Sequence, residues 1–177
     1  MILRAQKHAL LSAMIFQAKH DVRYYLNGIC FAPDQKLVST DGHRMFIGEH
    51  ESESLSENVI IKLTGPRFTS FECVEIDTDT GVASYLNEHG SRVALALAEV
   101  IDGRFPDYQR VIPQQSKPVS EISFQASLLS SVEKVAKLYN PKWQGISIKP
   151  NGANGAARID IKGPHGSASV IVMPMRN

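Results

Sequence analysis

The stretch "QASLLSSVEKVAKLY" at residues 125–139 carries the pattern on which the fold depends. Its apolar side chains recur every three or four residues, which predicts an amphipathic helix. A short alternating run, "SEISF" at 120–124, precedes it, and three longer ones follow it: "WQGISIKPNG", "AARIDIKGPHG" and "SASVIVMPMRN". Alternation of apolar and polar residues between glycine-bearing turns is typical of antiparallel strands. The last third of the chain is therefore predicted to be one strand, a helix and three more strands.

Two earlier segments repeat this organisation. Residues 7–18 again show the helical period, after a short strand at 2–4 and before a hairpin in "DVRYYLNGICFA" and "KLVSTDGHRMFIG". From "NVIIKL" onward come a strand, a place for only a poor helix at Pro66, and three alternating runs. Units that recur roughly every 55–60 residues indicate an internal repeat. We expect an α+β fold, with helices on one face of antiparallel sheets.

Composition excludes several classes of protein. The chain has 177 residues, 43% of them hydrophobic, and a net charge of +1, as in an ordinary globular protein. Cys30 and Cys73 lie in no CxxC or histidine-containing pattern, so we expect no disulfide, no metal site and no cofactor. No apolar run is long enough to span a bilayer, and residues 1–21 are too interrupted by Lys and His for a signal peptide. We expect a cytoplasmic protein without a membrane partner.

Three short motifs invite chemical interpretations. In "STDGHRM" at 39–45, Asp41 and His43 allow a catalytic dyad, but no Gly-x-Ser-x-Gly elbow accompanies them, so a tight turn is favoured. "DTDTG" at 77–81 lacks the glycine and distal glutamate of a calcium loop, and "GANGAA" at 152–157 lacks the features of a phosphate loop. Both are predicted to be hairpin turns, and no catalytic residue is assigned.

Four segments together resemble one family. "DVRYYLNGICF", "LVSTDGHRM", "DGRFPDYQRVIP" and "VIVMPMRN" resemble, in the same order and at similar spacings, the β sliding clamp of bacterial DNA polymerase III. The resemblance implies that residues 1–113 match the whole middle domain and that 114–177 match the second half of the last domain. The N-terminal domain and the first half of the last domain have no counterpart here. Members of this family form rings that are not catalysts but tether polymerases and repair enzymes to duplex DNA as processivity factors in replication.

The resemblance also implies site residues. In the family, a peptide from a client protein binds between the middle and last domains. Carried over, this pocket comprises Leu26, Thr40, Gly42, His43, Arg44, Pro106, Arg110, Val111, Leu128, Val172, Met173, Pro174, Met175 and Arg176. The residues expected to contact the DNA backbone, on basic helix faces, are Arg4, Lys7, Lys19, His20, Arg23, Lys134 and Lys137. Four departures from the family are Met45, Gln109, Leu128 and Asn177, which predict altered affinity or client choice.

The implied partners are double-stranded DNA, without sequence preference, a DNA polymerase, a clamp loader or other proteins that carry clamp-binding motifs, and further copies of the chain. Two hypotheses stay open. In the first, a shortened clamp encircles DNA, with four copies of three units closing a ring. In the second, a non-encircling mimic keeps the peptide pocket and competes with, or modulates, a full-length clamp. An enzyme that uses Asp41 and His43 is the least favoured interpretation.

Overall fold

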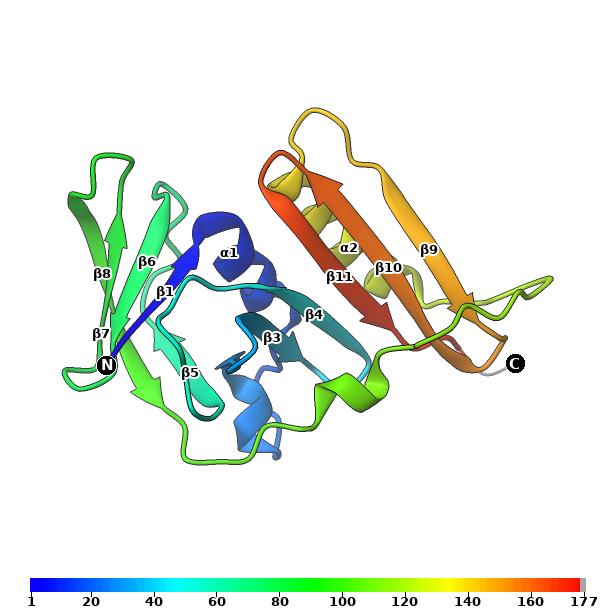
Figure 1. Cartoon of the computed structure of the whole chain (residues 1–177), viewed down its shortest axis with the longest axis horizontal. Coiled ribbons are helices and arrows are strands. Elements are labelled where there is room, and N and C mark those ends of the chain that lie inside the picture. Colours follow the sequence, from blue (N-terminus) through cyan, green and yellow to red (C-terminus); the bar gives the residue numbers. More distant parts are fainter. Residues whose placement is uncertain (176–177) are drawn as a thin grey trace.

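A computed structural model describes residues 1–175 and shows one curved, fully antiparallel sheet of 11 strands with two α-helices packed against it (Figure 1). The strand order is β1-β6-β7-β8-β5-β2-β3-β4-β11-β10-β9. The strands are β1 (Ile2–Gln6), β2 (Ile29–Phe31), β3 (Lys36–Thr40), β4 (Arg44–Glu49), β5 (Val59–Thr64), β6 (Cys73–Asp77), β7 (Val82–Leu86), β8 (Arg92–Val100), β9 (Ile146–Asn151), β10 (Gly155–Gly163) and β11 (Gly166–Val172). The predicted α+β class and its repeated units are confirmed, with the corrections below.

The first unit contains β1, helix α1 (Lys7–Phe16) and strands β2 to β4. Helix α1 is shorter than the predicted 7–18, because the chain is extended at Gln17 and the Ala18 N–H bonds to the Leu26 carbonyl at 3.0 Å. The strand expected from residue 21 is also wrong over its first half. There the Asn27 side chain bonds both main-chain groups of Asp21 at 2.9 Å, and residues 24–27 form a 3-10 turn, η1 (Tyr24–Asn27).

The second unit, β5 to β8, has no helix between β5 and β6, so the poor helix allowed at Pro66 does not form. Gly65 has a φ of 150°, outside the helical region, and Pro66 follows it. In place of a helix, Phe68 and Phe71 pack on Tyr85, with ring centroids 5.9 Å and 4.8 Å apart. Phe71 and Tyr85 are part of the buried core, and Phe68 packs against it.

The third unit contains helix α2 (Ala126–Tyr139) and strands β9 to β11, as predicted. Its first predicted strand, 120–124, is wrong, because no strand of residues 1–175 lies beside it to form a ladder. The turns predicted at 77–81 and 152–157 connect β6 to β7 and β9 to β10. Tyr139 ends α2 inside the core, where Phe46 lies 6.4 Å away between ring centroids.

Two kinds of strand pairing join the units. The first and second units exchange strands, with β1 beside β6 and β2 beside β5. The first and third units meet side by side through β4 and β11, where Val172 is opposite Arg44. Helices α1 and α2 lie next to each other on the sheet, and a common apolar core runs beneath both. The junction of β4 and β11 positions the candidate site.

Candidate functional site

An apolar cavity of about 220 Å³ lies at the end of the β4–β11 junction. Its walls come from η1, the β3–β4 turn, β11 and the segment that follows β8. The lining residues are Arg23, Leu26, Thr40, Gly42, His43, Arg44, Met45, Phe105, Pro106, Tyr108, Val111, Ile171 and Met173. A cavity with apolar walls and a few polar groups at its rim suits a short apolar segment of another protein.

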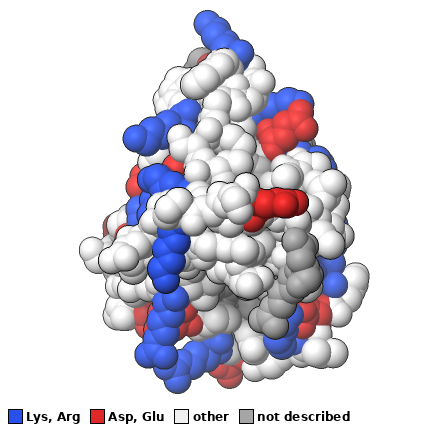
Figure 2. Space-filling model, turned by 90° about the vertical axis from the view of Figure 1, so that its right-hand side faces the viewer, with Lys and Arg blue, Asp and Glu red and all other residues white. Residues whose placement is uncertain are grey.

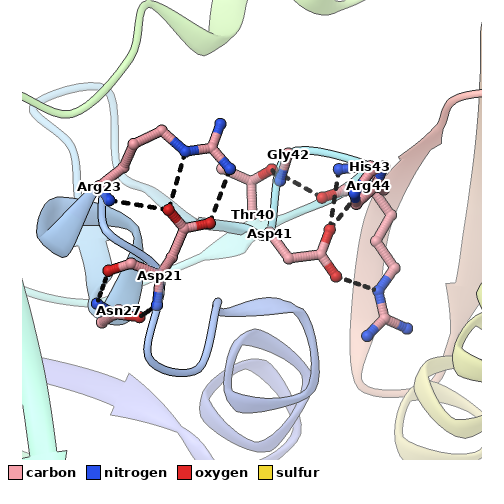
Figure 3. Close-up of polar contacts among 8 residues, drawn as sticks. All are labelled: Asp21, Arg23, Asn27, Thr40, Asp41, Gly42, His43 and Arg44. Atoms are coloured by element: carbon pink, nitrogen blue, oxygen red, sulfur yellow. Dashed lines mark hydrogen bonds and ion pairs between the residues drawn. The ribbon is translucent and has the colours of Figure 1, made fainter.

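The β3–β4 turn is held rigid by one carboxylate (Figure 3). Asp41 Oδ1 accepts hydrogen bonds from the main-chain N–H groups of His43 and Arg44, at 3.0 and 3.1 Å, and its Oδ2 accepts one from Arg44 Nε at 2.9 Å. The Arg44 guanidinium also donates to the Ile15 carbonyl and lies 4.8 Å from the centre of the Phe16 ring. These contacts fix the polar rim of the cavity to helix α1.

Arg23 forms the opposite side of the rim. Its guanidinium donates to both Asp21 carboxylate oxygens, at 3.0 and 2.8 Å (Figure 3), and these bonds lower the pKa of Asp21 to about 2. The same guanidinium lies so close to Gly42, whose φ is +90°, that a side chain at position 42 would contact it at 3.0 Å. The positive φ therefore favours glycine at this position, and a larger residue would also displace the Arg23 guanidinium.

The segment after β8 supplies the apolar wall. It contains a 3-10 turn, η2 (Tyr108–Val111), and buries Phe105 and Tyr108 against the first unit. The Tyr108 hydroxyl bonds the carboxylate of Asp34, at 2.7 Å from each oxygen. Burial, followed by this carboxylate, raises the pKa of Tyr108 above its usual range. The linker is thus pinned to the β2–β3 turn and leaves Pro106 and Val111 on the cavity.

The structure gathers part of the predicted pocket and separates the rest. Residues that line the cavity as expected are Leu26, Thr40, Gly42, His43, Arg44, Pro106, Val111 and Met173. Among those that do not line it, Val172 is fully buried and Arg110 pairs with Asp107 at 2.8 Å. Leu128 lies on α2, partly buried, and packs against the core. Pro174 and Met175 lie past β11, beyond the lining, and Arg176 and Asn177 fall outside the described residues.

Sequence reasoning missed five lining residues: Arg23, Met45, Phe105, Tyr108 and Ile171. Two of them carried a signal, since Phe105 and Tyr108 are the aromatic residues of a proline-containing linker. Ile171 could be recognised only through its position opposite Met45, because β4 and β11 are far apart in the chain. The resemblance assigns Arg23 to DNA, whereas its place at the cavity rim depends on Asp21.

A catalytic dyad is not formed by Asp41 and His43. The Asp41 carboxylate bonds the main-chain N–H of His43 and the guanidinium of Arg44, so its oxygens are occupied by structural partners. Within residues 1–175, no group of three or more His, Cys, Asp or Glu side chains is arranged to hold a metal ion. Cys30 and Cys73 are free and buried, and burial raises the pKa of both thiols.

The predicted DNA-contacting residues divide into paired and unpaired cations. Arg4 lies on strand β1, not on a helix face, and pairs with Glu75 at 3.2 Å. Arg23 pairs with Asp21, and Lys137 pairs with Glu133 at 2.5 Å. Over the part of the chain that the structure describes, Lys7, Lys19, His20 and Lys134 make no ion pair. A paired cation is a weaker ligand for phosphate than an unpaired one, because its carboxylate partner competes.

A polar hollow of about 670 Å³ crosses from the end of α1 to α2. Lys19, Arg67 and Lys134 line it together with Ser127 and Ser130. The Ser127 hydroxyl can donate to phosphate oxygens, whereas the Ser130 hydroxyl donates to the Ser127 carbonyl at 3.1 Å. Sequence reasoning missed Arg67, which lies in the segment where the sequence allows a poor helix. Helix α1 itself is mostly buried, so the basic face predicted for it is reduced to its ends. On the face that carries the third unit, Lys and Arg side chains form a column along one side (Figure 2).

Comparison with known proteins shows what this chain is similar to. The β sliding clamp of Vibrio cholerae is 29% identical over 92% of this chain and 46% of its own length, and that of Escherichia coli is 31% identical over 82% and 42%. A crystal structure of the Bacillus subtilis DNA polymerase sliding clamp matches with a TM-score of 0.65 and 15% identity, covering 100% of this chain and 64% of that one. This chain is a relative of the β sliding clamps.

The sliding-clamp fold is also shared by the Caulobacter crescentus clamp, with a TM-score of 0.60, 17% identity and coverage of 99% of this chain and 65% of that one. No profile of a known protein family matches the chain. The chain spans a little less than half the length of the curated clamps that it matches. None of the helices in residues 1–175 has the length and apolar character needed to cross a membrane.

Proposed function

We propose that this protein is a non-catalytic, clamp-like tether. It holds a DNA polymerase, or another protein with a clamp-binding motif, through a peptide in the β4–β11 cavity. It contacts duplex DNA through the polar hollow across α1 and α2. The observation that carries the proposal is the cavity itself. Residues implied by the clamp resemblance, from four separate stretches of the chain, line one space around Arg44 and Met173. Such a protein acts in the cytoplasm during replication, and a clamp loader is a further expected partner.

The cavity suits a client peptide for two physical reasons. Leu26, Val111 and Met173 offer apolar surface, and an unbranched methionine adapts its shape to different partners. The rim is pre-organised, since Asp41 and Asp21 already hold the two arginines in place. Little conformational entropy is therefore lost there when a peptide binds.

The polar hollow suits duplex DNA because three of its cations come from different elements and make no ion pair among the described residues. A fourth cation, Arg44, also lines it and is paired there with Asp41. Lys19 follows α1, Arg67 precedes β6 and Lys134 lies on α2. Contacts of this kind act on the phosphate backbone, so they do not depend on base sequence and weaken as salt rises. We therefore propose that these three residues, together with Lys7 and His20, contact DNA. Arg4, Arg23 and Lys137 have a minor role.

Peptide binding is tested by fluorescence polarisation with a labelled peptide that carries a clamp-binding motif. Met173→Ala removes apolar surface from the cavity wall and is expected to weaken binding by about tenfold. The matched control is Leu95→Ala on β8, which removes an exposed aliphatic side chain outside the cavity and should bind as tightly as the unmodified protein. Unchanged affinity in Met173→Ala, or failure of the unmodified protein to bind, would contradict the proposed site.

A further inference from the structure

The third unit has two extended segments with a main-chain edge that is unpaired within residues 1–175. One is the outer edge of β9, the last strand of the sheet (Figure 1). Lys117 covers only its far end, where the Lys117 N–H donates to the Pro150 carbonyl at 2.9 Å and the Lys117 carbonyl accepts from the Gly152 N–H at 3.1 Å. The other edge is the segment 121–125, just before α2. Open edges with unused main-chain donors and acceptors favour pairing with another chain.

The first two units show how such edges are closed. The strand that begins the first unit, β1, pairs with β6, and the strand that begins the second unit, β5, pairs with β2. The first strand of each unit thus pairs with the second strand of the other unit, so an approximate two-fold axis relates the two units. Leu3 faces Ile76 and Ala5 faces Val74 in this ladder, and all four side chains are buried.

Segment 121–125 matches β1 in its surroundings. A glutamine ends each segment and precedes the helix, Gln6 before α1 and Gln125 before α2. The Arg4 carbonyl accepts from the Glu51 N–H at 2.9 Å, and the Ser123 carbonyl accepts from the Met175 N–H at 2.7 Å. Because neighbouring residues of an extended chain point to opposite sides, Ile122 and Phe124 turn their main-chain groups to the side on which β1 meets β6.

Strand β9 matches β6 in the same way. The outward direction of the Pro150 carbonyl implies that the main-chain groups of Ile148 and Ile146 also face the open edge. Their side chains lie on the inner face of the sheet, because Ile148 is opposite Ile159 and Ile146 opposite Ile161, both buried. Ile146 and Ile148 are nonetheless 43% and 47% exposed, since nothing in residues 1–175 covers them.

We propose that the third units of two copies of this chain pair with each other, residues 121–125 of each copy running antiparallel to residues 145–149 of the other. Carried over from β1 and β6, the register gives these cross-strand pairs: Glu121 with Lys149, Ile122 with Ile148, Ser123 with Ser147 and Phe124 with Ile146. Apolar side chains face apolar ones in two of these pairs. Glu121 faces Lys149, whose ammonium group already bonds Asp160 at 2.6 Å, so the apolar pairs are the ones that favour the contact. The contact is isologous, so two copies satisfy it and no further copy can add to it.

The mass of the full chain in solution tests the contact. Light scattering is expected to give twice the single-chain mass of 19.5 kDa. Ile148→Lys places a charge on the inner face of the open edge and should weaken dimer formation by about tenfold or more. Ile148 is half exposed in the single chain, so this change leaves the fold intact. Leu95→Lys, at an equally exposed aliphatic residue on β8, is the matched control and should remain dimeric.

A cross-link tests the register. The double variant Ser123→Cys with Ser147→Cys should form disulfide-linked dimers on mild oxidation, whereas each single variant should not, because these positions face each other without intervening hydrogen bonds. A single-chain mass at every concentration would overturn the proposal. So would a dimer that persists in Ile148→Lys without cross-linking, or a complex that forms only with a full-length clamp. These readouts use neither DNA nor peptide, so they are independent of the proposed function.

Discussion

Asp41 shows how much of the candidate site depends on a single side chain. Its carboxylate accepts three hydrogen bonds, two from the turn that it begins and one from Arg44 Nε, and so joins the rim of the cavity to helix α1. The sequence allows this residue to be half of a catalytic dyad, but its bonds give it a positioning role. Removing the carboxylate frees the turn and leaves Arg44 without its partner.

We therefore predict that Asp41→Ala weakens peptide binding by about threefold to tenfold, the effect expected when hydrogen bonds to a charged group are removed. Fluorescence polarisation measures the change. Asp79→Ala is the matched control, since among the described residues that carboxylate bonds only the β6–β7 turn and the amino terminus. Equal affinities of the two variants would show that the turn does not depend on Asp41.

His8 provides a prediction about pH. Burial, and then the ring of His165 whose centroid lies 5.5 Å away, lower the pKa of His8 below 6.5, while Glu51 and Glu72 oppose this. Burial also lowers the pKa of His50. Because the unfolded chain then binds more protons than the folded one, the free energy of unfolding should fall as pH drops below about 6.5.

The His8 contribution is isolated by His165→Gln, which removes the neighbouring ring charge. The pKa of His8, followed by the NMR shifts of its ring, should rise toward its ordinary value in this variant. The free energy of unfolding, measured with urea, should also fall less between about pH 7.5 and about pH 5.5 in this variant than in the unmodified protein. An unchanged His8 pKa would mean that burial alone causes the shift.

At the scale of elements, the end of α2 is fitted closely to the end of β10. A side chain added at Gly163 would overlap the main-chain carbonyl of Tyr139, the last residue of the helix. Backbone cannot move aside as a side-chain tip can, so the helix itself would have to shift. This close approach fixes where α2 rests on the sheet.

Gly163→Ala is accordingly expected to lower the free energy of unfolding by about 1–3 kcal/mol, as overpacking does. Ser167→Ala, at the exposed end of the neighbouring strand β11, is the control and should change it by less than about 0.5 kcal/mol. Urea unfolding followed by circular dichroism gives both values. An unchanged free energy of unfolding in Gly163→Ala would show that α2 can shift on the sheet without loss of stability.

At the scale of the whole molecule, the arrangement of paired and unpaired cations predicts how DNA binding responds to salt. Lys134 makes no ion pair among the described residues and lines the polar hollow, whereas Lys137, one turn later on α2, pairs with Glu133. The two lysines differ in pairing but share a helix, so they form a matched comparison.

Lys134→Ala should weaken binding to duplexes of any sequence. It should also reduce the slope of log affinity against log salt by about 0.9 for each phosphate group that the variant no longer neutralises. Lys137→Ala should change that slope much less. Titrations at several salt concentrations measure both. Equal slopes of log affinity against log salt in the two variants would argue against the polar hollow as the DNA-contacting surface.

The sequence alone determined the local structure and the repeat. The period of residues 125–139 and the alternation after it were sufficient for α2 and β9 to β11, because those signals are short in range. The turn at 39–45 and the proline-containing linker were also readable, and with them the cavity residues that they carry. Arg110 and Leu128, predicted for the pocket, do not line the cavity, because Arg110 pairs with Asp107 three residues before it and Leu128 packs against the core.

Only the tertiary structure decided what depends on a partner strand. Residues 120–124 alternate like a strand but form none, since a ladder needs a neighbour and residues 1–175 supply none there. Arg67 and Ile171 enter their sites through contacts between distant segments, and Arg23 through Asp21. Periodicity specifies which face of a strand is apolar, whereas the pairing of strands is a property of the folded chain and, for β9, of the second copy that we propose beside it.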